Sequence, residues 1–124
     1  MSLFKTWRGW VAVLAAGVSL NLASPSAFSA ERSFRLYTVE VNGTKFWIPS
    51  TIVVKKGDSV KIEAMTKLEG AASVHGLSIP DFKIQEVVDQ KARILTFVAD
   101  KSGIFPISCH LHPPHVGSQL VVLE

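Results

Sequence analysis

Hydrophobic and polar residues alternate over short stretches along most of this chain, as they do in half-buried β-strands. Between residues 60 and 64 every even position is apolar and both odd positions carry a charge. Other short runs are rich in β-branched and aromatic residues and are bounded by glycine, proline or polar turn residues. The pattern predicts strands over residues 34–41, 45–48, 52–54, 59–65, 75–79, 84–88, 92–98, 104–109 and 118–123.

The connections between these runs are short and have the composition of turns. Asn42-Gly43 is a tight-turn signal between the first two runs, and residues 55–58 and 100–103 are polar and contain glycine. Residues 67–73 are predicted to form a loop. Short strands at this spacing indicate an all-β, antiparallel sandwich or barrel. Because no internal repeat or interdomain linker is found, we expect one domain.

The first thirty residues differ from the rest. A basic start is followed by an apolar stretch from Trp10 to Leu22 and then by small residues from Ala23 to Ala30, the order of a secretory signal peptide. A membrane anchor is the alternative, but spanning a bilayer takes about 20 apolar residues. We therefore predict a signal peptide over residues 1–30 and a mature domain over 31–124, located in the periplasm without a stable membrane anchor. Cleavage after Ser29 fits the small-residue pattern best, and cleavage after Ala30 is the alternative.

Removal of the signal changes the charge of the protein. The precursor has a net charge of +3, but the 13 Lys and Arg residues include Lys5 and Arg8. The mature domain therefore has a net charge near +1, and no basic stripe remains that would indicate binding to nucleic acid. A domain of this size has a small core and is often stabilised by disulfides or metal. The single cysteine, Cys109, cannot form an internal disulfide, so it is a partner for another chain, a reactive thiol or a metal ligand.

The residues with metal-binding chemistry are concentrated near that cysteine. The segment from Cys109 to His115 contains the cysteine and three of the four histidines, and the fourth, His75, lies 34 positions before the cysteine. A lone cysteine or histidine would be unremarkable in a core or a loop. A Cys-x2-His-x2-His loop after a strand, however, can direct a thiolate and two imidazoles at one point, a ligand set that suits copper or zinc. Two prolines, at 113 and 114, restrict the loop.

Several segments also resemble the cupredoxin family of copper proteins. The resemblance covers residues 50–124 and rests on residues 53–60, on Val74-His75-Gly76-Leu77, on the segment 99–109 that ends in the cysteine, and on residues 116–122. It implies a Greek-key antiparallel β-sandwich or barrel and a mononuclear copper centre. Carried over onto this sequence, the two-histidine, one-thiolate set is His75, Cys109 and His112.

The sequence departs from the usual family pattern at the next ligand. No methionine follows Cys109, and His115 stands where the weak methionine ligand is found in most members. The loop spacing resembles short-loop, amicyanin-like members, and the extra histidine resembles nitrosocyanin, in which a carboxylate stands where His75 stands here. We thus predict His75, Cys109, His112 and His115 as metal ligands and His110 as a non-ligand, since neighbours in an extended segment point to opposite sides. An imidazole in place of the thioether should favour Cu(II) and give a green, red or purple centre. Dinuclear centres that need a second cysteine are excluded.

The resemblance implies electron transfer through one Cu(I)/Cu(II) ion, with a redox partner such as a cytochrome, rather than an enzyme. Two alternatives remain open: copper tolerance or delivery, and binding of a small molecule such as nitric oxide at an open copper position. A zinc site of one cysteine and three histidines also remains chemically possible.

Overall fold

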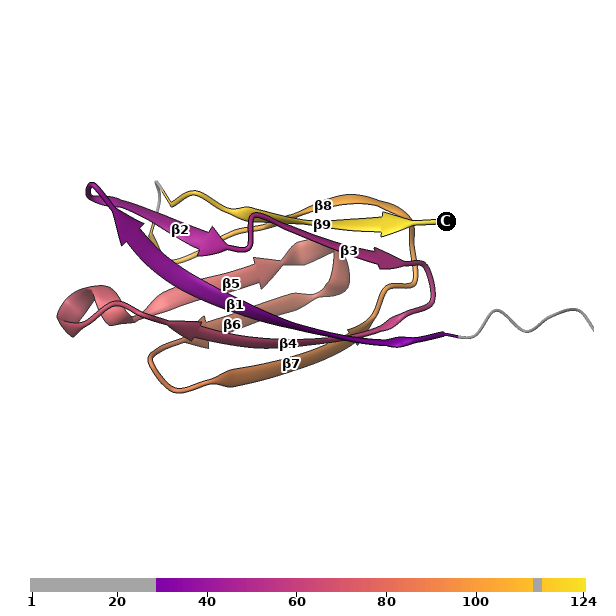
Figure 1. Cartoon of the computed structure of the whole chain (residues 1–124), viewed down its shortest axis with the longest axis horizontal. Coiled ribbons are helices and arrows are strands. Elements are labelled where there is room, and N and C mark those ends of the chain that lie inside the picture. The colour runs from indigo at the N-terminus through magenta and orange to yellow at the C-terminus, as the bar shows by residue number, and fades with distance from the viewer. Residues whose placement is uncertain (1–28, 113–114) are drawn as a thin grey trace, which may run out of the picture.

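The computed structural model describes residues 29–112 and 115–124. Within them the chain forms nine strands and two short 3₁₀ helices (Figure 1). The elements are β1 (Glu31–Val41), β2 (Thr44–Ile48), β3 (Thr51–Lys55), β4 (Ser59–Thr66), η1 (Gly70–Ser73), β5 (His75–Ile79), η2 (Pro80–Phe82), β6 (Ile84–Val88), β7 (Arg93–Val98), β8 (Gly103–Ile107) and β9 (Ser118–Leu123).

One layer is a four-stranded sheet in the order β2-β1-β4-β7. The β1–β2 pair is an antiparallel hairpin whose two turn residues, Asn42 and Gly43, have φ angles of 51° and 79°. Two successive positive φ values define the turn type that suits a two-residue hairpin, which explains the Asn-Gly pair. Strand β4 pairs with β7 in antiparallel and with β1 in parallel orientation.

The second layer contains β3-β9-β8 and the β5–β6 hairpin. Strand β9 pairs with β3 in parallel and with β8 in antiparallel orientation. A bridge between Ser78 in β5 and Ser108, just after β8, joins the hairpin to this sheet through two backbone hydrogen bonds of 2.8 and 3.0 Å. The bridge holds β5 beside the segment that contains the cysteine.

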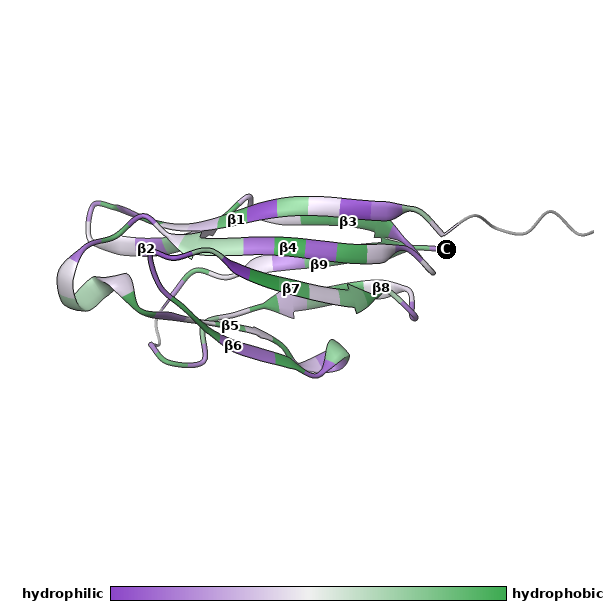
Figure 2. Ribbon diagram, turned by 90° about the horizontal axis from the view of Figure 1, so that it is seen from below, coloured by the Kyte–Doolittle hydropathy of each residue, from purple (hydrophilic) through white to green (hydrophobic). Residues whose placement is uncertain are grey.

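The core lies between the layers and consists of the inward positions of the alternating strands. Strand β4 shows this alternation along its length (Figure 2). Buried hydrophobic residues come from both layers and include Leu36, Trp47, Ile62, Leu77 and Leu120. The predicted all-β sandwich is therefore confirmed, although two of its strand pairs are parallel.

Two local predictions differ from the structure. The strand expected to end on Cys109 ends at Ile107, because Ser108 already turns to bridge β5. Residues 70–73, within the predicted loop, form η1. The predicted signal peptide lies outside the described residues, apart from Ser29 and Ala30. Within the described part of the chain, no helix is long and apolar enough to cross a membrane.

Candidate metal centre

His75 is held in one orientation by the turn that precedes it. It is the first residue of β5, separated from η1 only by Val74, and it is completely buried. Its Nε2 lies 2.6 Å from the carbonyl oxygen of Ala72, so the ring donates its Nε2 hydrogen to that oxygen. Its Nδ1 is buried without a hydrogen-bond partner. Because a buried polar atom normally has a partner, the unpaired Nδ1 is available as a metal ligand. The hydrogen bond from Nε2 to Ala72 fixes the tautomer of the ring that this requires.

Cys109 lies beside β5 because of the bridge between Ser78 and Ser108. The backbone N–H of Gly76 donates a 3.1 Å hydrogen bond to its Sγ. Gly76 permits this approach because it has no side chain. A Cβ there would stand 2.8 Å from the backbone nitrogen of His110, and closer still to two atoms of the His110 ring. The glycine therefore explains how the thiol and β5 come into direct contact.

His115 is placed by backbone bonds to β2. Its neighbour Val116 accepts a hydrogen bond from Trp47 N–H at 3.1 Å and donates one to the Lys45 carbonyl at 3.0 Å. The His115 ring lies 6.1 Å from the buried Trp47 ring, measured between centroids. Its Nδ1 lies 3.3 Å from the carbonyl oxygen of Val116, and its Nε2 is buried without a partner.

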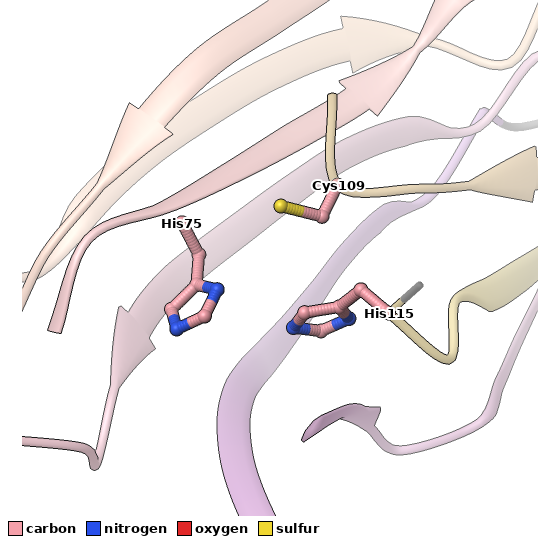
Figure 3. Close-up of side chains that lie close together, drawn as sticks. All are labelled: His75, Cys109 and His115. Carbon is pink, nitrogen blue, oxygen red and sulfur yellow. The ribbon is translucent and has the colours of Figure 1, made fainter. Parts of the chain in front are cut away.

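These three side chains converge on one point from three segments of the chain (Figure 3). His75, Cys109 and His115 each offer a donor atom, and these atoms lie within 4.8 Å of one another. The two rings lie 5.0 Å apart at 62°. His112 is adjacent and exposed: its Nδ1 is 3.8 Å from the sulfur, and its ring is 5.3 Å from that of His75.

The surroundings keep the two inner imidazoles neutral. Burial lowers the pKa of His75 and of His115, and the positive charges of Lys45 and of a protonated His112 lower both further. The backbone carbonyls of Ala72 and Val116 oppose these shifts but do not cancel them. An unprotonated imidazole is the form that ligates a metal, so the centre favours metal over proton.

The donors fit a soft or borderline metal ion. A thiol sulfur lies among imidazole nitrogens, two of which are buried and unpaired, and this combination suits copper or zinc. A pocket of about 380 Å³ opens beside the rings and is lined by Gly43, Lys45, Ala71, Ala72, His75, His112 and His115. The centre is therefore accessible from one side.

The structure thus brings three of the four predicted ligands together and places the fourth, His112, at their margin. His110 is outside the group among the described residues, since it packs against Gly76. Sequence reasoning missed the Gly76 N–H and the Ala72 carbonyl, which act through the backbone and leave little trace in the sequence. A glycine inside a strand, which often marks a close approach of another segment, was the one available signal. Trp47 is buried in the core and also packs beside His115.

A comparison with protein-family models gives a match to the cupredoxin-like domain over residues 12–122. The chain has no match among curated proteins.

Solved structures with a similar fold include several copper proteins. The metal-binding domain of the Cu(I)-exporting P-type ATPase of Streptococcus pneumoniae matches with a TM-score of 0.64 and 15% identity, covering 80% of this chain and 92% of that one. Auracyanin A, a blue copper protein of Chloroflexus aurantiacus, matches with a TM-score of 0.57 and 14% identity, covering 75% and 99%. A copper nitrite reductase of Nitrosomonas europaea matches with a TM-score of 0.61 and 16% identity, covering 75% of this chain but 41% of the reductase. At these identities the likeness is one of fold.

Proposed function

The chain belongs to the cupredoxin-like family, and we propose that it holds one copper ion between His75, Cys109 and His115. The observation that carries this proposal is the pair of buried imidazole nitrogens without partners beside the cysteine thiol. Burying such atoms unpaired costs about 1–3 kcal/mol each, a cost that a bound metal removes. The copper ions named in the structures of similar fold agree with this choice of metal.

His112 is proposed as the fourth ligand. Its Nδ1 already lies 3.8 Å from the sulfur, and its ring is exposed on the pocket side. A centre with three imidazoles and one thiolate contains a harder donor than the usual thioether, which favours Cu(II).

Electron transfer is the function that this geometry supports best. A bound copper ion supplies one-electron exchange between Cu(I) and Cu(II). Contacts within the chain hold the donors in place: Ala72 fixes the His75 ring, Gly76 fixes the sulfur, and the bonds of Val116 to β2 fix the backbone next to His115. Ligands that move little between the Cu(I) and Cu(II) states keep the reorganisation energy of electron transfer small, as an electron carrier requires.

Copper tolerance or delivery is the second candidate. The pocket beside the rings is the observation that favours it, because an exposed His112 at an open mouth offers a first contact for incoming metal. The sequence of residues 1–30 supports export to the periplasm for either function. A carrier there would exchange electrons with a protein such as a cytochrome.

The metal assignment is tested by loading the domain with Cu(II) and recording visible and EPR spectra. An intense thiolate-to-copper band, absent in Cys109→Ser and altered in His115→Gln, is expected. His110→Gln is the matched control, since its ring lies outside the donor group, and it should retain the band. A colourless protein that takes zinc in preference to copper would contradict the proposal.

A second experiment separates the two functions. Reversible voltammetry with rapid electron exchange with a cytochrome is expected for a carrier. Slow exchange, together with copper-induced expression and copper sensitivity on deletion, would instead establish copper handling.

A further inference from the structure

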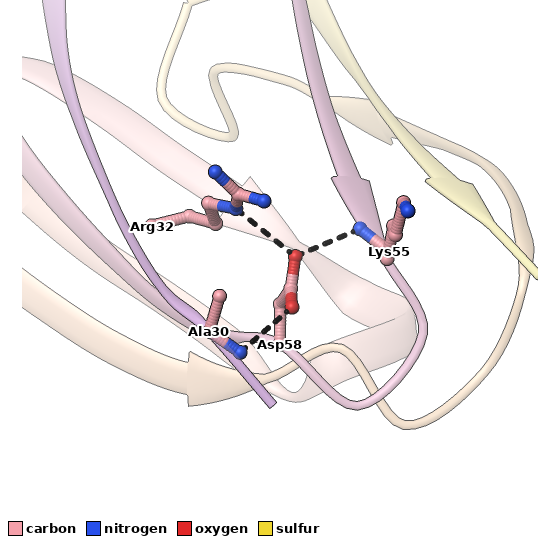
Figure 4. A network of polar contacts seen from close by, with 4 residues as sticks. All are labelled: Ala30, Arg32, Lys55 and Asp58. Atoms are coloured by element: carbon pink, nitrogen blue, oxygen red, sulfur yellow. Dashed lines mark hydrogen bonds and ion pairs between the residues drawn. The ribbon is translucent and has the colours of Figure 1, made fainter. Parts of the chain in front are cut away.

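A second cluster lies at the opposite end of the domain from the metal centre and centres on Asp58, in the turn between β3 and β4 (Figures 1 and 4). The Asp58 side chain is only 4% exposed. Its Oδ2 accepts the backbone N–H of Lys55 at 2.9 Å and the Nε–H of Arg32 at 3.4 Å. Its Oδ1 accepts the backbone N–H of Ala30 at 3.1 Å. A buried carboxylate is therefore aimed at the backbone nitrogen of the residue that precedes β1.

Ala30 is part of the folded domain, whereas Ser29 is exposed. The Ala30 carbonyl accepts the Ser59 N–H at 2.9 Å, which continues the β1–β4 pairing by one residue. The peptide bond between Ser29 and Ala30 thus lies at the border of the fold. This is also the bond that the small-residue pattern identifies as the preferred cleavage position.

We propose that cleavage after Ser29 makes Ala30 the first residue of the mature protein and that its new α-ammonium group pairs with the buried carboxylate of Asp58. Hydrolysis of this peptide bond consumes one water and leaves a carboxylate on the released segment and an amino group on Ala30. The nitrogen needs no movement, since it already lies at bonding distance from Oδ1. The ionised Asp58 already makes this hydrogen bond charge-assisted on the acceptor side, and cleavage adds a positive charge on the donor, so the bond becomes an ion pair as well.

The alternative cut, after Ala30, is disfavoured by the same contacts. It would remove the Ala30 N–H and carbonyl together, leaving Oδ1 of a buried carboxylate and the Ser59 N–H without these partners. Unpaired buried polar groups are costly, charged ones most of all. A mature chain that begins at Ala30 therefore keeps two contacts of the fold that a chain beginning at Glu31 loses.

The charged surroundings permit the pair. Among the described residues, Arg32 is the charged side chain in contact with Asp58, and it lies on the other carboxylate oxygen. Lys55 contacts Asp58 only through its backbone, and its side chain is exposed, as are those of Glu31 and Asp100. The carboxylate is ionised at neutral pH, because these hydrogen bonds, with that of Lys55 the largest, lower the pKa of Asp58.

The first test is the mass of the protein exported from cells that express the full chain. A mature chain beginning at Ala30 is expected; a chain beginning at Glu31 or later, or one that retains its leader, overturns the proposal.

The second test compares two proteins released from a fusion partner without added residues, one beginning at Ala30 and one at Ser29. The Ser29 protein is the matched control, because it keeps the Ala30 amide and moves the charge away from Asp58. At pH 6 the Ala30 protein should melt about 4–8 °C higher, the shift expected when an ion pair is added to this hydrogen bond in a domain of this size. An α-amino group with a raised pKa contributes its full stabilisation below about pH 8, so the difference should vanish as pH rises through the raised value.

A direct titration keeps the proposal testable even where a variant fails to fold. The α-amino group of the Ala30 protein, followed by nitrogen NMR, should titrate above its ordinary range of about 7.7–8.0. In Asp58→Asn it should return to that range, and the difference in melting temperature should disappear. An α-amino group that titrates normally in the unaltered Ala30 protein would refute the ion pair.

Discussion

The contact between Gly76 and the segment that follows β8 makes Gly76→Ala the most informative single substitution. A Cβ at this position would stand 2.8 Å from the His110 backbone nitrogen, whereas ordinary contacts begin at 3.4 Å. A backbone atom cannot rotate away as a side chain can, so β5 and the cysteine segment must separate by about 0.6 Å at this point. Overpacking of this kind typically destabilises a domain by about 1–3 kcal/mol.

The same movement weakens the hydrogen bond from Gly76 N–H to Cys109 Sγ. Its length would grow from 3.1 Å to roughly 3.7 Å, which weakens the bond without removing it, because sulfur accepts hydrogen bonds over longer distances than oxygen does. A hydrogen bond to the sulfur withdraws electron density and stabilises Cu(I), so its weakening lowers the reduction potential. Complete loss of a net contribution of about 1 kcal/mol corresponds to roughly 40 mV, because a tenfold change in a one-electron equilibrium is 59 mV, and the shift should lie below this value.

The assay is voltammetry of the copper-loaded domain, together with the position of the thiolate-to-copper band. Ser78→Ala is the matched control, since it lies in the same strand and keeps the backbone bonds to Ser108. The double variant Gly76→Ala/His110→Ala should be rescued only in part, because the backbone nitrogen of residue 110 remains in the way. An unchanged potential in a folded Gly76→Ala protein would refute the link between this contact and the metal.

Four further predictions follow from the metal centre and from the Asp58 cluster. Trp47 is the only tryptophan from residue 30 onward, and its ring lies 6.1 Å from that of His115. One equivalent of copper should therefore quench the Trp47 fluorescence. Equally strong quenching in His115→Gln would contradict the assignment of His115 as a ligand. Because the pKa values of His75 and His115 are lowered, both imidazoles stay unprotonated as pH falls past 6.5, and copper should be lost only below that pH, as measured by the visible band. Removal of copper by a chelator should lower the melting temperature, by the equivalent of about 2.7 kcal/mol when free copper had been at one hundred times its dissociation constant. Because the pKa of Asp58 is lowered, its stabilisation is present above its unfolded value of about 3.9 and fades as pH falls further; in Asp58→Asn, acid unfolding followed by circular dichroism should depend less on pH in that range.

The fold and the ligand types were predictable because they depend on local patterns. Alternation fixes which face of a strand is buried, and Asn42-Gly43 selects the hairpin turn, so the sandwich follows from residues near one another in the sequence. The cluster from Cys109 to His115 is likewise local.

The arrangement around the ligands was not predictable in the same way. The parallel pairings of β1 with β4 and of β3 with β9 join distant segments, and a hydrophobic pattern does not specify a partner strand. The support of the centre is also made of backbone groups, the Ala72 carbonyl and the Gly76 N–H. Every residue type except proline has both groups, so their role at the metal centre cannot be recognised from the residue types in the sequence.

The parallel pair of β3 and β9 also bears on the order in which the protein is made. Strand β3 emerges from the ribosome early, but its partner β9 comes much later, since Thr51 pairs with Gln119. Strand β8, made shortly before β9, also pairs with it. Contacts across a separation such as that of β3 and β9 form slowly, and the segment that contains Cys109 and His115 is synthesised just before β9. A nascent chain of this protein therefore has neither a closed second sheet nor a fixed set of ligands until β9 has been made. Before that point His75, Cys109 and His115 are not held together, so a complete metal site forms only after the whole domain has been synthesised.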